Sequence, residues 1–266
     1  MNVPEFQELI WQKGRELYRE MPWRENTNPY FVLVSELMLQ QTQVDRVVPK
    51  FQQFMAAFPV ISDLAVAPLS EVLTVWSGLG YNRRAKFLHE AAKKVMADFA
   101  GKVPSTYEAL IQLPGVGPNT AGAILAYSFN QPVVFIETNI RTVYFHHFFD
   151  ESAMVSDKEL REKVKQTVDK EHPREWYWAM MDYGAYLKKQ GAGRIDKSSH
   201  YKKQAPLKGS MREVRGLILK SLTLRDFMYE ELAAALPQDE RFNQAISALK
   251  SEGLINQTGE RLHLLR

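Results

Sequence analysis

The chain has 266 residues, 45% of them hydrophobic and 24% charged, as in a globular protein with room for one large or two modest domains. It contains no cysteine, which excludes disulfides, thiolate zinc sites and cysteine-ligated iron–sulfur clusters. The N-terminal residues lack a signal-peptide pattern, and the longest apolar runs are too short to span a bilayer. We therefore expect a cytoplasmic protein that does not enter a membrane.

Basic residues are concentrated in one segment, although the net charge is only +3. Between Gly184 and Lys220 there are ten lysines and arginines against Asp196 and Glu213. Such a segment is typical of a surface that faces a polyanion, and equally of a solvated lysine-rich linker.

Apolar spacing, with proline and glycine at the breaks, predicts helices for most of residues 1–190. Pro29 suits the first turn of a helix that runs from Tyr30 to about Gln41. Further helices are predicted over residues 6–17, 45–58, 70–76, 87–96, 106–112, 119–129, 139–149, 157–170 and 176–188. The one strand-like stretch, Val133 to Ile136, is too short to build a sheet. Residues 1–190 are therefore predicted to be an all-α domain.

A second, smaller domain is predicted at the C-terminal end. Residues 191–210 are rich in Gly, Lys and Ser and indicate a basic linker. Helices follow over 211–222, 225–236 and 240–252, the last ending at Gly253. A hairpin comes next, with strands at 254–255 and 262–264 and a turn at Asn256–Gly259. Three helices and a hairpin, over residues 211–266, are typical of a winged helix-turn-helix, an interaction module for nucleic acid or protein.

The most informative motif is LPGVGPNTAGAI at residues 113–124. Its glycines form a tight turn between two helices, and bare glycine backbone can approach a phosphate closely. Pro118 then starts a helix whose N-terminal amides point toward that anion. A lone GxG favours an ordinary corner between helices, but the extended pattern is more specific. We expect sequence-independent DNA contacts from Gly115, Val116, Gly117 and Thr120.

This segment resembles the hairpin of the helix-hairpin-helix DNA glycosylases, the endonuclease III superfamily. Four other segments resemble its A/G-mismatch adenine glycosylases (MutY-type), in family order: PWR at 22–24, SELMLQQTQV at 35–44, WSGLGY at 76–81 and MMDYGA at 180–185. The resemblance covers about residues 1–190. It implies a two-lobed, all-α fold and excision of a base flipped out of duplex DNA.

Glu36 is the first candidate catalytic residue. It lies among Val32, Leu33, Val34, Leu37, Met38 and Leu39. An apolar environment raises the pKa of a carboxyl group and keeps its proton available near neutrality. The resemblance makes Glu36 the general acid that protonates the departing adenine. Without the resemblance, a buried carboxylate satisfied by a helix N-terminus or an arginine would be the better interpretation.

A second carboxylate is expected to stabilise the cationic sugar of the transition state. The resemblance places an aspartate after the hairpin in an Asp-Gly-Asn-Val pattern, where this chain has Glu137-Thr-Asn-Ile. Glu137 thus replaces the aspartate with one extra methylene, and a shift of about 1 Å can lower a rate roughly a hundredfold. Asn139 matches the family residue that helps to hold the site.

Other positions depart from the family pattern. Asn119 stands where bifunctional members carry a Schiff-base lysine, so a monofunctional enzyme that uses water is predicted. Asn82 replaces a tyrosine that enters the base stack, a task that Tyr81 and Gln41 could share. The four cluster-binding cysteines and the Nudix-like domain that checks the opposite base have no counterpart here.

The sequence thus predicts a monomeric, nucleoid-associated glycosylase that acts on double-stranded DNA with a mispaired or damaged base. Adenine opposite guanine or 8-oxoguanine is the expected substrate. Gln40, Gln41 and Arg24 are expected to line the base pocket or the gap left in the duplex, and the hairpin could hold a monovalent cation. Two alternatives stay open: another lesion (mismatched thymine, hypoxanthine or an alkylated base), or a non-catalytic protein that senses mispairs.

Overall fold

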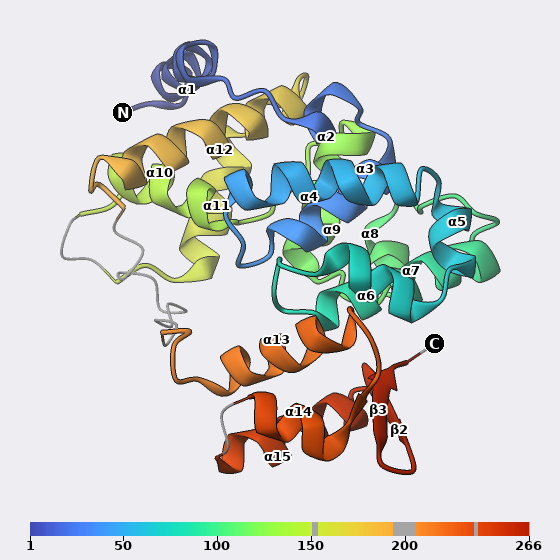
Figure 1. The fold of residues 1–266 in the computed structure, drawn as a ribbon. Helices are drawn as coiled ribbons and strands as arrows, with labels where there is room; N and C mark the ends of the chain where they lie inside the picture. The colour runs from blue at the N-terminus through green and yellow to red at the C-terminus, as the bar shows by residue number, and fades with distance from the viewer. Residues whose placement is uncertain (151–153, 194–205, 237–238, 266) are drawn as a thin grey trace. The chain divides into compact units, whose positions relative to one another are not determined.

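A computed structural model describes residues 1–150, 154–193, 206–236 and 239–265 (Figure 1). It confirms the predicted helical fold. The helices up to residue 193 are α1 (Val3–Leu17), α2 (Pro22–Glu25), α3 (Pro29–Leu39), α4 (Val44–Ala57), α5 (Ile61–Val66), α6 (Leu69–Trp76), α7 (Arg83–Asp98), α8 (Tyr107–Leu110), α9 (Pro118–Phe129), α10 (Thr138–Phe148), α11 (Asp157–Thr167) and α12 (Pro173–Lys189). Of these, the sequence had predicted no helix at α2 or at α5.

The described chain forms two compact units, each assembled from distant segments. Unit 1 contains residues 1–32, 105–112, 116–150 and 154–193. Unit 2 contains residues 33–104, 113–115, 206–236 and 239–265. The predicted linker at 191–210 lies mostly outside the described residues, and the predicted domain boundaries stay a prediction.

Unit 1 is built around α12, which packs against α1 and α10 (Figure 1). Helix α1 begins with a capping box, in which Asn2 and Glu5 each bind the other's backbone N–H. Its apolar face buries Phe6 fully, and the ring of Phe6 lies 6.0 Å from that of Trp176 on α12. A Cβ on Gly14 would lie 2.6 Å from the Cβ of Ala179, so only glycine permits this close crossing of α1 and α12.

Unit 2 joins the helical segment 33–104 to the C-terminal segment. In the first, α7 packs against α5 and α6, and Trp76 and Leu88 are fully buried. The second contains α13 (Met211–Leu222), β1 (Phe227–Met228), α14 (Tyr229–Ala235), α15 (Glu240–Ser251), β2 (Ile255–Thr258) and β3 (Arg261–Leu264). The strands form an antiparallel sheet in the order β1-β3-β2, and α13 packs against α15.

Two predictions for the C-terminal segment are wrong in detail. The helix expected over 225–236 begins only at Tyr229, because Phe227 pairs with Leu262 across the sheet and the N–H of Tyr229 donates to the Glu260 carbonyl at 2.8 Å. The hairpin turn lies after Thr258, at Gly259 and Glu260, and not at residues 256–259. Gly259 supplies the positive φ, +59°, that this tight turn requires.

The hydropathy of the helices bears on whether the chain could cross a membrane. Among the residues that the structure describes, no helix has the length and apolar character needed to cross a bilayer.

Candidate functional site

The glycine-rich hairpin connects α8 to α9, as its sequence predicts. Gly115 has φ +79°, and a Cβ there would lie 2.9 Å from the Cβ of Phe87 and 3.2 Å from a methyl of Leu37. Gly117 is the exposed N-cap of α9, and a Cβ there would meet nothing within 4 Å. The first glycine is therefore required by packing, while the second leaves the backbone at the start of α9 open to an anion.

Glu36 lies on α3, the helix that packs against this hairpin. Its side chain is half-buried, and both chain neighbours, Ser35 and Leu37, are fully buried. One turn further on, the side-chain Nε2 of Gln40 donates to the Gly115 carbonyl at 3.3 Å. The helix that carries Glu36 is thus fixed to the hairpin by Leu37 and Gln40.

Arg84 holds the end of α3 in place. Its Nη1 donates to the carbonyls of Leu37 at 2.8 Å and of Gln40 at 2.6 Å, and its Nη2 donates to that of Gly80 at 3.0 Å. A cation at the C-terminus of a helix also interacts favourably with the helix dipole. Burial lowers the pKa of Arg84 to about 10, so the guanidinium stays charged at neutral pH.

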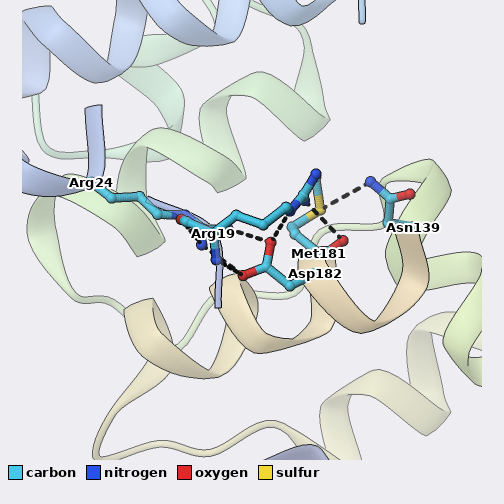
Figure 2. Close-up of polar contacts among 5 residues, drawn as sticks. All are labelled: Arg19, Arg24, Asn139, Met181 and Asp182. Carbon is cyan, nitrogen blue, oxygen red and sulfur yellow. Dashed lines mark hydrogen bonds and ion pairs between the residues drawn. The ribbon is translucent and has the colours of Figure 1, made fainter. Parts of the chain in front are cut away.

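Arg24 has a partner that the sequence does not suggest (Figure 2). Its two Nη atoms donate to Asp182 on α12 at 2.7 and 3.0 Å, and Arg19 Nε donates to the same carboxylate at 2.6 Å. The side chains of Arg24 and Asp182 are 3% and 1% exposed. Arg24 therefore fixes the chain before α3 to α12, and its place in a base pocket stays a prediction.

The start of α10 carries Glu137 and Asn139, both in unit 1. Glu137 is the N-cap, and its Oε2 accepts from the backbone N–H of Asn139 at 2.9 Å. The Asn139 side chain lies 3.9 Å from the sulfur of Met181, next to Asp182 (Figure 2), while its Oδ1 is buried without a hydrogen-bond partner. The carboxylate of Glu137 is thus folded back on the helix, where the positive end of the helix dipole favours a negative charge.

Close packing of α12 against α10 explains part of the MMDYGA motif. A Cβ on Gly184 would lie 2.3 Å from the backbone oxygen of Asn139. Lys188, one turn along α12, interacts electrostatically with Glu137: desolvation lowers the pKa of the lysine, and the nearby carboxylate raises it. The pKa of Lys188 is lowered on balance, because desolvation outweighs the effect of the Glu137 charge.

Asn119 and Thr120 lie in the first turn of α9. Asn119 is exposed, and its Oδ1 accepts from the backbone N–H of Ile136 at 3.3 Å, which ties the start of α9 to the segment before Glu137. Thr120 is buried. Their predicted contacts with the substrate and with DNA stay predictions.

Tyr81, Asn82, Gln40 and Gln41 line a pocket of about 990 Å³ within unit 2. The opposite wall is α13 of the C-terminal segment, including Met211, Arg212, Arg215 and Leu219. Arg212 Nη1 donates to the Tyr81 hydroxyl at 2.5 Å. The guanidinium groups of Arg84 and Arg212 lie 5.4 and 5.3 Å from the centre of the Tyr81 ring.

Comparison with known proteins identifies the family. A family model described as "HhH-GPD superfamily base excision DNA repair protein" matches residues 34–170. The adenine DNA glycosylase of Mycobacterium tuberculosis (strain ATCC 25618 / H37Rv) is 31% identical over 273 residues, which cover 94% of this chain and 89% of that protein. The chain belongs to the HhH-GPD superfamily.

Other relatives match a smaller share of the chain. The adenine DNA glycosylase of Buchnera aphidicola subsp. Baizongia pistaciae is 36% identical over 173 residues, 64% of this chain and 48% of that protein. The chain thus spans about half the length of that relative. The structure of a thermostable thymine-DNA glycosylase matches with a TM-score of 0.66 and 26% identity, over 75% of this chain and 96% of that one. A trapped endonuclease III–DNA intermediate shares the fold, with a TM-score of 0.58 and 17% identity, over 82% of this chain and 95% of that one.

The HhH-GPD match contains Glu36, the hairpin and Glu137, but ends before the residues that sequence reasoning missed. These are Asp182, Lys188 and Arg212. An acidic residue within the apolar MMDYGA segment was a signal for Asp182. Lys188 and Arg212 are two of many basic residues in their segment, and only the structure singles them out.

Proposed function

We propose that this chain is a monofunctional DNA glycosylase, which hydrolyses the N-glycosidic bond of a mispaired base flipped out of duplex DNA. The observation that carries the proposal is the attachment of α3 to the hairpin. Leu37 packs against Gly115, and Gln40 donates to its carbonyl, so a backbone bound at the hairpin lies beside the helix that bears Glu36. Membership of a base excision repair superfamily supports the same function.

In the proposed reaction, the Glu36 carboxylic acid donates its proton to a ring nitrogen of the base. The bond from the sugar to the base breaks, and its electron pair leaves with the neutral base. The sugar becomes a cation that the Glu137 carboxylate stabilises. Water adds to this cation and gives up a proton to the Glu36 carboxylate, which restores the acid. Double-stranded DNA is the proposed partner, and extrusion of a mispaired base is the least costly.

Adenine opposite guanine or 8-oxoguanine is the proposed substrate, because the relatives named above are adenine DNA glycosylases. Mismatched thymine is a second candidate, favoured by the similarity to a thymine-DNA glycosylase structure. Excess protein should be incubated with duplexes that contain adenine, thymine, hypoxanthine or an alkylated base, and the free base measured. Release of thymine without adenine would reassign the substrate, and release of no base from any duplex would contradict the function.

Glu36→Gln tests the acid within the same assay. The amide keeps the size of the side chain but has no carboxylic proton, so we expect excision to be abolished and mismatch binding to stay within a few-fold of wild type. The matched control is Glu71→Gln, which makes the same change at an exposed residue of α6. Excision by Glu36→Gln at the wild-type rate would show that another group donates the proton.

A further inference from the structure

Arg84 on α7 is a buried cation, 7% exposed, that binds two segments far apart in sequence. Its Nη1 donates to three carbonyls at the end of α3, at 2.6 to 2.8 Å: those of Leu37, Met38 and Gln40. Its Nη2 donates to the Thr42 hydroxyl and the Gly80 carbonyl, both at 3.0 Å. Within the described ranges of the chain, none of its hydrogen bonds or ion pairs is to a carboxylate. Burial of a charge without a counter-charge costs free energy, which these bonds must offset.

Arg84 also fixes two turns of unusual backbone conformation. Gln41 has φ +58° and Tyr81 has φ +47°. Residues other than glycine rarely adopt positive φ, and such a conformation persists only where the surrounding contacts hold it. The guanidinium binds the carbonyl directly before each of these residues, that of Gln40 and that of Gly80. It therefore holds the end of α3 and the turn before α7 in one arrangement.

Helix α7 contacts the glycine hairpin as well as α3. Phe87, three residues beyond Arg84, fills the space beside Gly115, where a Cβ would lie 2.9 Å from the Phe87 Cβ. Gln40 accepts from Arg84 through its carbonyl and donates through its Nε2 to the Gly115 carbonyl at 3.3 Å. One helix thus sets the positions of both the hairpin and the end of α3, one turn beyond Glu36.

We propose that Arg84 is a positioning residue for the general acid: it fixes α3, and with it Glu36, at a set place relative to the hairpin. This inference rests on the proposed function. A duplex whose backbone is bound at the hairpin presents its extruded base at a fixed distance from that backbone, so the proton donor must be held to match. A misplacement of about 1 Å can lower a rate roughly a hundredfold. In this role Arg84 acts through α3 and donates no proton itself.

The test is single-turnover excision of adenine opposite guanine with saturating full-length protein, so that the rate constant reports the chemical step and a titration reports affinity. Arg84→Lys keeps the charge, but an ammonium group lacks the planar fork that reaches both segments. We expect its rate constant to fall about tenfold, with duplex affinity within a few-fold of wild type. Thr42→Val removes one acceptor of Nη2 and should lower the rate constant by a smaller factor.

Arg174→Lys is the matched control, because Arg174 binds the end of a different helix in the same way. It donates to the carbonyls of Tyr127 and Ser128 at the end of α9, and the following residue, Asn130, also has positive φ, +52°. The substitution should lower stability about as much as Arg84→Lys and leave the rate constant unchanged. Urea denaturation measures the stability of both variants and shows whether they are folded under the assay conditions.

The outcomes separate a positioning role from a structural one. A rate constant unchanged by Arg84→Lys, or lowered equally by Arg174→Lys, would overturn the inference. Loss of affinity without loss of rate would overturn it as well, because Arg84 would then serve DNA binding. If Arg84→Lys does not fold, Thr42→Val decides, and a wild-type rate constant for that variant counts against the inference.

Hydrogen–deuterium exchange tests the inference without excision. The amides of residues 37–43 should exchange faster in Arg84→Lys than in wild type, and Arg174→Lys should leave them unchanged. Equal exchange in the wild type and Arg84→Lys would overturn the inference alone. Absence of excision by wild type, with the exchange as expected, would instead overturn the proposed function.

Discussion

At the residue scale, the acidic side chains assigned to chemistry and to structure have different surroundings. Glu36 is half-buried between fully buried chain neighbours, and Glu137 caps α10. Asp182 is almost completely buried and binds two arginines, Arg19 and Arg24. The carboxylate of Asp182 therefore has a structural role, whereas the proposed reaction assigns the proton donor to Glu36 and the negative charge to Glu137.

Two substitutions of Glu137 distinguish the contribution of its negative charge to the rate from the contribution of its N-cap to stability. Glu137→Gln keeps an oxygen that can accept from the Asn139 N–H, so stability should stay near wild type. The single-turnover rate should fall about a hundredfold, because the sugar cation loses a preorganised negative charge. Glu137→Ala removes both the charge and the cap and should also lower stability by about 1 kcal/mol. If Glu137→Gln excises as fast as wild type, another group supplies the charge.

Asp182 should be essential for stability. Asp182→Asn leaves the buried guanidinium of Arg24 without a counter-charge, which should lower the free energy of unfolding by about 3–5 kcal/mol. Urea denaturation measures this loss. The control Asp98→Asn breaks an exposed pair with Lys94 and should leave the midpoint almost unchanged. Equal effects of the two variants would contradict a structural role for the buried pair.

The residue at position 119 predicts whether the reaction leaves an intact strand with an abasic site or a cleaved strand. Without a lysine at this position, borohydride should trap little or no covalent complex between protein and DNA, and strand scission should require added alkali. Asn119→Lys places an amine at the exposed start of α9 and should increase trapping. Efficient trapping by wild type would contradict the monofunctional proposal, and Lys188, which interacts electrostatically with Glu137, would be the first amine to replace.

At the element scale, the order of helix, glycine turn and helix is local, but its position depends on contacts with other helices. Gly115 touches Phe87 of α7 and Leu37 of α3, and Arg84 of α7 binds the carbonyls at the end of α3. The hairpin, α3 and α7 are thus far apart in sequence but are joined by a few contacts. A change at the hairpin should therefore affect stability and DNA binding together.

Gly115→Ala tests this coupling. The new Cβ would lie 2.9 Å from Phe87, in a backbone conformation at φ +79° that L-residues rarely adopt. Gly209→Ala is the matched control, because its φ is +76° but a Cβ would meet nothing within 4 Å. Thermal unfolding and duplex binding should show a larger loss for Gly115→Ala, and the difference reports the steric contact. Equal losses would mean that backbone strain alone is responsible.

At the scale of the whole molecule, charge is distributed unevenly along the chain. Part of the basic segment, residues 194–205, lies outside the described residues, but Lys208 and Lys220 are described and exposed. If this segment faces DNA, its lysines replace counterions on the phosphates, and affinity depends on salt accordingly.

The double variant Lys208→Gln/Lys220→Gln should weaken duplex binding and make the slope of log affinity against log salt shallower by about 1.8. Lys158→Gln/Lys165→Gln removes the same charge from exposed positions of α11, which also carries Asp157, Glu159 and Glu162, and should leave the slope near that of wild type. Fluorescence anisotropy at several salt concentrations measures both slopes. Identical slopes for the two variants would show that Lys208 and Lys220 do not contact phosphate.

The sequence by itself determined most helices, the hairpin and the order of the C-terminal elements. Helix periodicity, proline at the first turn and glycine at the end are local signals, so Pro29 and Gly253 marked boundaries correctly. Strand β1 escaped prediction because Phe227 becomes extended only by pairing with Leu262, which is distant in sequence. Helices α2 and α5 were missed because four and six residues give too short a periodic signal.

Only the tertiary structure decided which side chains act as partners. Arg24 meets Asp182 across 158 residues, and Arg212 meets Tyr81 across 131, so no local pattern predicts either pair. The sequence located Glu137 as a departure from the family, but only the structure showed its carboxylate folded back on α10. Local propensity acts between neighbours along the chain, whereas the pairing of buried charges depends on which elements pack together.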